Sequence, residues 1–210
     1  MTYDDLYSAA KSRYFVTIIK NLKKNREIKK FIPELEELSY YNQKPEFHPE
    51  GITVWDHVIA ALETYTGTDP IVKLAILFHD IGKSNTASGY DSETHPYYSF
   101  HEHQYTGVDL MDSVGSRLGF PKDVLNTIKY CIRNHMRTHK LLKMNPGKVR
   151  TLAQHKDWEI LKEVSYCDDA CRGPVVFDEE LFNSNMDYAE KLRQMNDGEY
   201  RIYLKELKKN

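Results

Sequence analysis

Apolar residues recur every three or four positions along most of this chain, and that spacing places them on one face of an α-helix. Leu6, Ala10, Tyr14 and Ile18 show the pattern near the N-terminus. The alternation of apolar and polar residues that is typical of a half-buried strand is nearly absent, and no internal repeat interrupts the helical spacing. The sequence therefore predicts an all-α protein, and its 210 residues are enough for one domain with its own core.

Residues that favour helix ends divide the chain into elements. Thr53 and Asp69 stand where N-caps are expected, and a proline suited to the first helical turn follows Asp69. Gly82 is expected to end the apolar helix that contains IVKLAILFHD. Residues 84–98 are rich in Ser, Thr, Gly and Tyr and are predicted to form a loop, and Asp157 is predicted to cap a late helix.

Three parts are predicted along the chain. An N-terminal helical segment, 1–45, is expected to pack on a central core, 46–173, and a helical tail, 174–210, follows the breaking pair Gly173-Pro174. The acidic residues of the tail oppose a basic stretch of the core, so we expect the tail to dock on the same molecule.

Cysteine use and hydropathy indicate a cytoplasmic protein. Cys131, Cys167 and Cys171 are odd in number and lack CxxC spacing, which favours reduced thiols. The N-terminus has acids where a signal peptide needs bases, and no stretch approaches the roughly 18 apolar residues of a membrane span. The net charge of −2 demands no nucleic acid or membrane partner, and no DNA-specific motif is visible.

Histidines and aspartates at the ends of apolar helices are the candidates for chemistry. His79 and Asp80 end one such helix, His57 lies on the inner side of the preceding helix, and Asp168 and Asp169 end a late one. Imidazole and carboxylate together suit hard or borderline divalent metals, and an acid pair beside apolar residues needs a partner such as a metal. A single histidine on an apolar face is more often a core residue, and an HD dipeptide arises often by chance. The ordered set is what indicates a metal site.

The segments around these residues resemble a known family. The segments are HPEG, TVWDHVIAALE, LAILFHDIGK, HEHQYTGVDLMDSVGSRLGFP, IRNHMRTH and CDDACRG. In order and spacing they are similar to the HD domain of bacterial tRNA nucleotidyltransferases, the CCA-adding enzymes. The likeness covers about residues 14–173. The nucleotidyltransferase head of those enzymes has no counterpart before residue 31, so we expect no CCA addition. The resemblance implies a metal-dependent phosphohydrolase of the HD superfamily.

The resemblance also implies a set of metal ligands. The first ion would be held by His57, His79, Asp80 and one of the late aspartates. Asp168 is favoured over Asp169 because Cys167 supplies the small residue that usually precedes this aspartate, although the spacing to the following Arg-Gly fits less well.

A dinuclear version would add His103 and His135, with Asp80 as a bridge. His103 is favoured over His101 because it stands four residues before Gly107, as in the HxxxG pattern of the superfamily. Two histidines at i and i+2 point to different sides of a helix, so both bind one ion only if the helix begins between them. One or two divalent ions, Mn, Ni, Co, Mg, Fe or Zn, are the expected cofactor.

Basic residues point to a phosphorylated substrate. Lys83 is predicted to act beside Asp80 in catalysis by contacting the phosphate or the leaving oxygen; the alternative is a cation at a helix C-terminus. Between Val124 and Lys156 the chain has eight basic residues and no acid, which would attract phosphates and suit an RNA backbone. The residues predicted to contact substrate or phosphate are His101, His139, Arg133, Arg137 and Lys140.

The predicted function is hydrolysis of a nucleotide or RNA-end phosphate ester. The resemblance implies 2′,3′-cyclic phosphodiesterase, 2′-nucleotidase or phosphatase activity. A 5′-nucleotidase or (d)NTP triphosphohydrolase is the alternative among enzymes, since it uses the same metal cradle with a different pocket. A non-catalytic RNA-binding scaffold is the alternative from another class, and metal content separates it from either enzyme.

Overall fold

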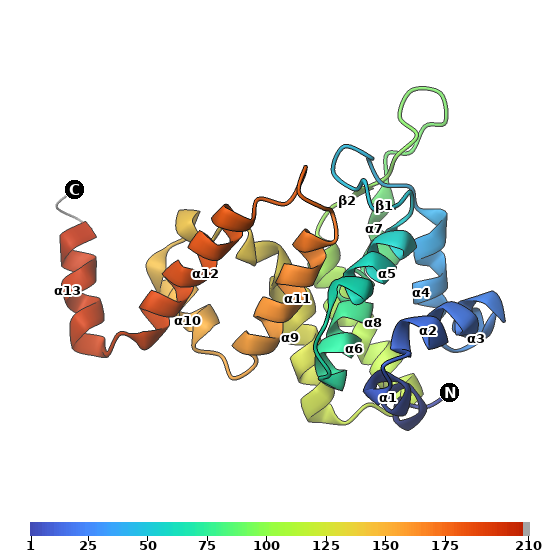
Figure 1. The fold of residues 1–210 in the computed structure, drawn as a ribbon, viewed down its shortest axis with the longest axis horizontal. Coiled ribbons are helices and arrows are strands. Elements are labelled where there is room, and N and C mark those ends of the chain that lie inside the picture. The colour runs from blue at the N-terminus through green and yellow to red at the C-terminus, as the bar shows by residue number, and fades with distance from the viewer. Residues whose placement is uncertain (208–210) are drawn as a thin grey trace.

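The computed structural model describes residues 1–207, and helices make up most of that range (Figure 1). The all-α prediction is confirmed. The N-terminal elements are α1 (Tyr3–Lys11), α2 (Phe15–Lys24), α3 (Glu27–Phe31), α4 (Pro33–Glu37) and the short 3₁₀ helix η1 (Leu38–Tyr40). The central elements are α5 (Val54–Thr64), α6 (Pro70–Phe78), α7 (Lys83–Thr86), α8 (His103–Leu118) and α9 (Lys122–Thr138). The C-terminal elements are η2 (Leu141–Lys143), α10 (Pro146–Ala153), α11 (Trp158–Ala170), α12 (Glu179–Gln194) and α13 (Asp197–Leu207).

Helix α6 lies at the centre of the core. Its residues Leu74 to Phe78 are fully buried, and the helix packs against α5, α9 and α11 (Figure 1). A helix that is apolar on all sides is stable only when other elements surround it. The end of α6 therefore delivers His79 and Asp80 into the middle of the bundle, although both side chains are polar.

The predicted caps at Thr53 and Asp69 are confirmed. The Thr53 hydroxyl accepts a hydrogen bond from the Asp56 amide at 3.2 Å, and the Asp56 carboxylate accepts one from the Thr53 amide at 2.9 Å. The Asp69 carboxylate accepts from the amide of Ile71 at 2.7 Å. Such caps satisfy amides that have no partner inside the helix, so they define where α5 and α6 begin.

Asp157 stands at the N-cap of α11, as predicted, but its side chain does not make the capping bond. Its carboxylate accepts hydrogen bonds from the Thr127 hydroxyl at 3.0 Å and from Lys156 at 2.9 Å, and it makes no side-chain bond to the start of α11. A partner from α9, which is distant in sequence, competes for the same oxygen atoms.

The chain between α6 and α8 differs from the prediction in two respects. Helix α6 ends at Phe78 and not at Gly82, because the backbone tightens into shorter turns in which Ile81 donates to the carbonyl of Phe78 at 3.0 Å. The predicted loop 84–98 contains most of α7 and the strand β1 (Ala87–Ser88). This strand pairs antiparallel with β2 (Ser99–Phe100), and α8 follows.

Gly82 allows the turn after Asp80 to approach α8 closely. A Cβ atom at this position would lie 1.9 Å from the carbonyl oxygen of His103 and 2.5 Å from the amide nitrogen of Gly107. The φ angle of Gly82 is −65°, which alanine adopts freely, so space is the only obstacle.

We expect Gly82→Ala to lower the free energy of unfolding by about 3 kcal/mol, because a backbone clash cannot relax as a side-chain overlap does. For a chain of this size, that loss corresponds to a decrease in Tm of roughly 6–12 °C, measurable by calorimetry. Gly198→Ala is the control, because its Cβ would meet only the Asn196 side chain at 3.2 Å. Equal Tm values for the two variants would contradict the role of Gly82.

The tail docks on the core through α12, as expected. Phe182, Met186, Ala189 and Leu192 are buried, and α12 packs mainly against α10. Helix α13 has no buried residue and lies at the end of the molecule opposite α1 (Figure 1). The boundaries after residues 45 and 173 stay predictions. Within residues 1–207 we find no helix that combines the length and the apolar character needed to cross a bilayer.

Candidate metal centre

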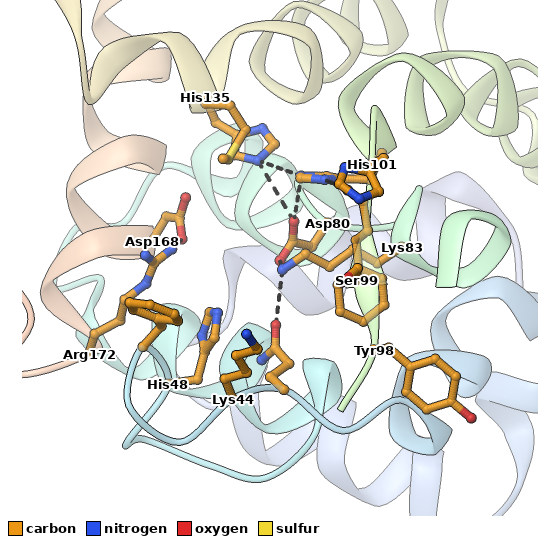
Figure 2. A pocket seen from close by; sticks show the side chains of 15 residues that line it. Lys44, His48, Asp80, Lys83, Tyr98, Ser99, His101, His135, Asp168 and Arg172 are labelled. Atoms are coloured by element: carbon orange, nitrogen blue, oxygen red, sulfur yellow. Dashed lines mark hydrogen bonds and ion pairs between the residues drawn. The ribbon is translucent and has the colours of Figure 1, made fainter. Parts of the chain in front are cut away.

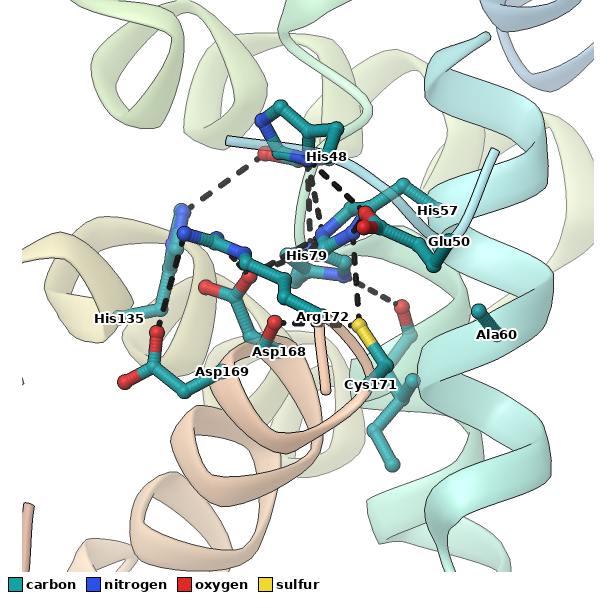
Figure 3. Close-up of polar contacts among 12 residues, drawn as sticks. His48, Glu50, His57, Ala60, His79, His135, Asp168, Asp169, Cys171 and Arg172 are labelled. Carbon is teal, nitrogen blue, oxygen red and sulfur yellow. Dashed lines mark hydrogen bonds and ion pairs between the residues drawn. The ribbon is translucent and has the colours of Figure 1, made fainter. Parts of the chain in front are cut away.

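Six imidazole and carboxylate side chains converge beside the end of α6. They come from α5, the α6–α7 turn, α8, α9 and α11, which pack around this point (Figures 2 and 3). The six are His57, His79, Asp80, His103, His135 and Asp168. None of these residues is more than 5% exposed. Burial of so many polar groups is costly unless each has a partner.

One half of the cluster consists of His57, His79, Asp168 and one oxygen of Asp80. The Nε2 atoms of His57 and His79 are 3.3 Å apart, and His57 Nε2 is 3.0 Å from Asp168 Oδ1. His79 Nε2 is 3.3 Å from Asp80 Oδ2. Two ligands that are each about 2.0–2.2 Å from a common ion lie about 3.0–3.6 Å apart, so these spacings fit a single metal.

The other half consists of His103, His135 and the second oxygen of Asp80. The two Nε2 atoms are 3.2 Å apart and lie 3.2 and 3.7 Å from Asp80 Oδ1 (Figure 2). Asp80 thus directs one oxygen to each half. A carboxylate in this position is suited to bridge two ions, as in dinuclear hydrolytic sites.

Hydrogen bonds at the opposite ring nitrogens orient three of the imidazoles. The Nδ1 atoms of His79, His103 and His135 lie 2.8, 3.0 and 2.8 Å from backbone carbonyl oxygens. A carbonyl only accepts, so Nδ1 carries the proton and a neutral ring presents its lone pair at Nε2. These Nε2 lone pairs face one another and face two carboxylates. The groups repel one another unless a cation lies between them. The donor set therefore fits a divalent metal.

The titration behaviour of His135 and Asp80 agrees with this interpretation, whereas the Asp80 and Asp168 carboxylates raise the pKa of His79 against the effect of burial, so a metal ion would displace a proton from that ring. Burial lowers the pKa of His135 to about 3, so its ring is neutral. Burial also raises the pKa of the Asp80 carboxyl, but the ammonium group of Lys83 outweighs that effect and holds it well below its usual range. The cluster thus combines a neutral imidazole with an ionised carboxylate that contacts both halves.

Glu50 is a further residue of the site, and the sequence did not single it out. Its Oε1 atom lies 2.6 Å from His57 Nδ1 and 2.9 Å from His48 Nδ1 (Figure 3). The Glu50 side chain is only 4% exposed. A carboxylate that accepts from Nδ1 fixes the ring and makes Nε2 a better ligand. The motif HPEG contains Glu50, but only the folded loop shows that it contacts His57.

We expect Glu50→Gln to weaken metal binding about 10- to 100-fold, because the amide loses the charge that polarises His57. Isothermal titration of the metal-free protein with Mn²⁺ measures the affinity. Glu46→Gln, an exposed position in the same loop, is the matched control and should bind as the wild type does. Wild-type affinity in Glu50→Gln would show that Glu50 does not position His57.

The two late aspartates lie in different surroundings. Asp168 is buried and joins the cluster, and Arg172 donates to its Oδ1 atom at 2.6 Å. Asp169 instead accepts from His139 Nδ1 at 2.9 Å at the edge of the site. This geometry supports Asp168 as the ligand. The structure also places the start of α8 at His103, so His101 precedes the helix and only His103 reaches Asp80.

A cavity of about 340 Å³ opens above the cluster. Lys83 donates to Gln43 at 3.0 Å and pairs with Asp80 at 2.7 Å (Figure 2). The cationic and imidazole side chains that line the wall, besides the cluster itself, are Lys44, His48, Lys83, His101 and Arg172. Such a wall favours binding of an anionic ligand directly above the candidate metal positions.

Three basic residues predicted to contact phosphate do not line this cavity. The Arg133 guanidinium lies 3.7 Å from the centre of the Tyr105 ring, and Arg137 donates to the Asn134 side chain at 2.8 Å. Lys140 is exposed at the end of α9. His139 contacts Asp169, its Nε2 atom lies 3.9 Å from Asp168 Oδ2, and it borders a smaller cavity. The phosphate-binding role of these four residues stays a prediction.

A helical bundle that gathers buried imidazoles and carboxylates beneath an anion-binding cavity is the architecture of a metal-dependent phosphohydrolase. The chain belongs to the HD domain family, which its sequence matches over residues 54–172. With its buried His/Asp cluster it is an HD-domain phosphohydrolase that acts on a phosphate ester.

Similar curated proteins match a part of this chain that is somewhat longer than residues 54–172. A multifunctional CCA protein of Alkalilimnicola ehrlichii is 30% identical over 128 residues, which is 60% of this chain and 29% of the relative. One from Halorhodospira halophila is 30% identical over 142 residues, 67% of this chain and 32% of the relative. The chain thus matches about a third of the length of these relatives.

Proposed function

We propose that this chain hydrolyses a 2′,3′-cyclic phosphate or a 2′-phosphate on a nucleotide or an RNA end. The supporting observation is the juxtaposition of the His/Asp cluster with a cavity whose wall carries cations. In this proposal the first ion is held by His57, His79, Asp80 and Asp168, and a second by Asp80, His103 and His135. The similarity to multifunctional CCA proteins over the HD segment supports the choice of ester.

The protein's own groups would divide the work as follows. A divalent ion in this centre supplies positive charge for the phosphoryl oxygens and for activation of water. Lys83 is held by Gln43 and Asp80, so its ammonium group is fixed where it neutralises charge on the phosphate or the leaving oxygen. Arg172 borders the same cavity and offers a planar set of donors to a second phosphate edge.

An apolar surface at the mouth of the cavity supports a nucleotide substrate. Phe47 lines the cavity and is 51% exposed, which is unusual for a phenylalanine. Tyr98 and Phe100 line it as well, and Tyr98 stacks on Tyr90 with ring centres 4.8 Å apart. Exposed aromatic faces of this kind stack on nucleobases without strong preference for one base.

A panel of phosphate esters tests the proposal. Phosphate release, or ring opening, would be measured for 2′,3′-cyclic AMP, 2′-AMP, 5′-dAMP, dATP and bis-p-nitrophenyl phosphate with Mg, Mn, Co or Ni added. We expect the highest kcat/KM with one of the first two compounds. Preference for 5′-dAMP or dATP would replace the proposal by a 5′-nucleotidase or triphosphohydrolase. Absence of both bound metal and turnover would leave the RNA-binding scaffold.

Lys83→Gln is expected to lower kcat by roughly 10²-fold, because one fixed donor to the developing charge is lost. The glutamine side chain can still donate to Gln43, but it lacks the positive charge of the ammonium group. Lys129→Gln is the control, since its partner is the exposed Asp112 at 2.5 Å and it does not line the cavity. If Lys83→Gln changed KM alone, the residue would bind the substrate without stabilising the transition state.

A further inference from the structure

A second hollow, on the other side of α9 from the metal centre, has the chemistry of a nucleic-acid contact. It lies between α9 and α10 and measures about 430 Å³. Its lining contains two cations, several neutral hydrogen-bonding groups and two aromatic rings, and it contains no carboxylate. The lining side chains used below are Tyr130, Asn134, Arg137, Lys148, Thr151 and His155. We call this hollow the α9–α10 groove.

Most of the positive charge around the groove is not neutralised by the protein. Of the basic residues between positions 124 and 156, three are paired with acids: Lys129 with Asp112, Arg150 with Asp197, and Lys156 with Asp157. The other five form no ion pair with any residue in the range 1–207: Arg133, Arg137, Lys140, Lys143 and Lys148. Of these five, Arg137 and Lys148 line the groove itself.

Two groove features favour RNA over an acidic protein. The ring of His155 lies on that of Tyr130, with centres 3.8 Å apart and planes inclined by 9°. The His155 side chain is 40% exposed, so the pair forms a platform on which an unpaired base can stack. Thr151, an exposed neutral side chain of the lining, can also meet a ribose hydroxyl.

The position of the groove relates it to the metal centre. Arg137 follows His135 by two residues on α9, and residues at that spacing point to nearly opposite sides of a helix. The two sites are therefore separated by one helix, a width of about 10–12 Å. Lys140 and Lys143 follow the end of α9 and add two cations to the chain between Arg137 and Lys148.

We propose that the α9–α10 groove binds the phosphodiester backbone of single-stranded RNA, so that the end of this RNA reaches the metal centre. The choice of an RNA end as substrate rests on the proposed function, whereas binding in the groove requires no turnover. Arg137 and Lys148 make the phosphate contacts, and the Tyr130–His155 pair stacks on a base.

Binding is tested with the full chain and a fluorescently labelled single-stranded 12-mer RNA that ends in a 3′-hydroxyl, by anisotropy at several KCl concentrations. Arg137→Gln combined with Lys148→Gln should weaken binding about 10-fold and reduce the slope of log K against log[salt] by about 1.4, for two lost contacts. Lys148→Gln alone should reduce the slope by about 0.7, and it disturbs no hydrogen bond of the described chain.

The matched control removes two charges elsewhere. Lys24→Gln combined with Lys29→Gln changes two exposed lysines of the N-terminal segment and should leave RNA affinity unchanged. Equal weakening in the control and groove variants would overturn the proposal, because general charge would then account for binding. Equal affinity for DNA of the same sequence, or complete displacement of RNA by poly-glutamate at matched charge, would overturn the assignment to RNA.

A kinetic comparison separates failure of the groove from failure of the proposed function. Lys148→Gln alone should raise KM about 3-fold for RNA that ends in a 2′,3′-cyclic phosphate and leave kcat/KM for 2′,3′-cyclic AMP unchanged, because Lys148 lines only the groove. Equal effects on both substrates would overturn the groove. If the wild type hydrolysed neither substrate but bound RNA through the groove, the proposed function would fail and the groove would stand.

Discussion

Asp80→Asn is expected to reduce kcat with 2′,3′-cyclic AMP by at least about 10³-fold and to remove most bound metal. One Asp80 oxygen lies near His57 and His79, and the other near His103 and His135. Asparagine has the same shape, but it has no charge and it presents an NH₂ group to one set of ligands. The substitution therefore affects both halves of the cluster at once.

Metal content by mass spectrometry and steady-state kinetics would be measured on the same preparation. Asp112→Asn is the control, because within residues 1–207 that exposed aspartate pairs only with Lys129 on the surface. Near-wild-type circular dichroism would show that loss of activity is not loss of fold. Retention of more than a tenth of the wild-type kcat would contradict the role given to Asp80.

Removal of divalent metal is expected to lower the Tm by about 5–11 °C. The physical reason is that the folded protein holds the imidazole lone pairs and carboxylates of the cluster together, whereas the unfolded chain separates them and binds the ion weakly. An ion present at 100 times its Kd stabilises the folded state by about 2.7 kcal/mol, and each kcal/mol shifts the Tm of a chain of this size by roughly 2–4 °C.

Calorimetry with EDTA, and again after addition of excess Mn²⁺ or Zn²⁺, measures this shift. Asp80→Asn should show a much smaller response to the ion, since Asp80 directs one charged oxygen toward each of the two positions. An identical Tm with and without metal in the wild type would contradict the assignment of the cluster as a metal centre.

Local physics explains how much of the fold could be predicted. Helical spacing and caps depend on residues within a few positions of one another, so Thr53 and Asp69 indicated correctly where α5 and α6 begin. The strongly apolar α6 with a polar end also follows from the sequence, because such a helix belongs in a core. At Asp157 the start of the helix was predicted correctly, but Thr127 of another helix takes up the carboxylate and the capping bond is absent.

The candidate site shows the same division. The resemblance of the segments around His57, His79-Asp80 and the late acid indicated the HD family, since such segments are a property of the chain itself. It did not separate Asp168 from Asp169, because adjacent helical residues differ by about 100° in direction and only the packing of α11 decides which one faces inward. The packing places Asp168 beside His57 and leaves Asp169 with His139.

Contacts between distant segments also decided the remaining features. His103 begins α8 because the β1–β2 pair and the close approach of Gly82 hold that segment, and His101 is left in the turn before it. Glu50 reaches His57 only because its loop folds over the cluster. The sequence alone determined the helices, the family and the residue types of a metal centre. The tertiary structure decided which side chains join the metal centre and which basic residues lie outside its cavity. The reason is that the direction of a side chain depends on what its helix packs against.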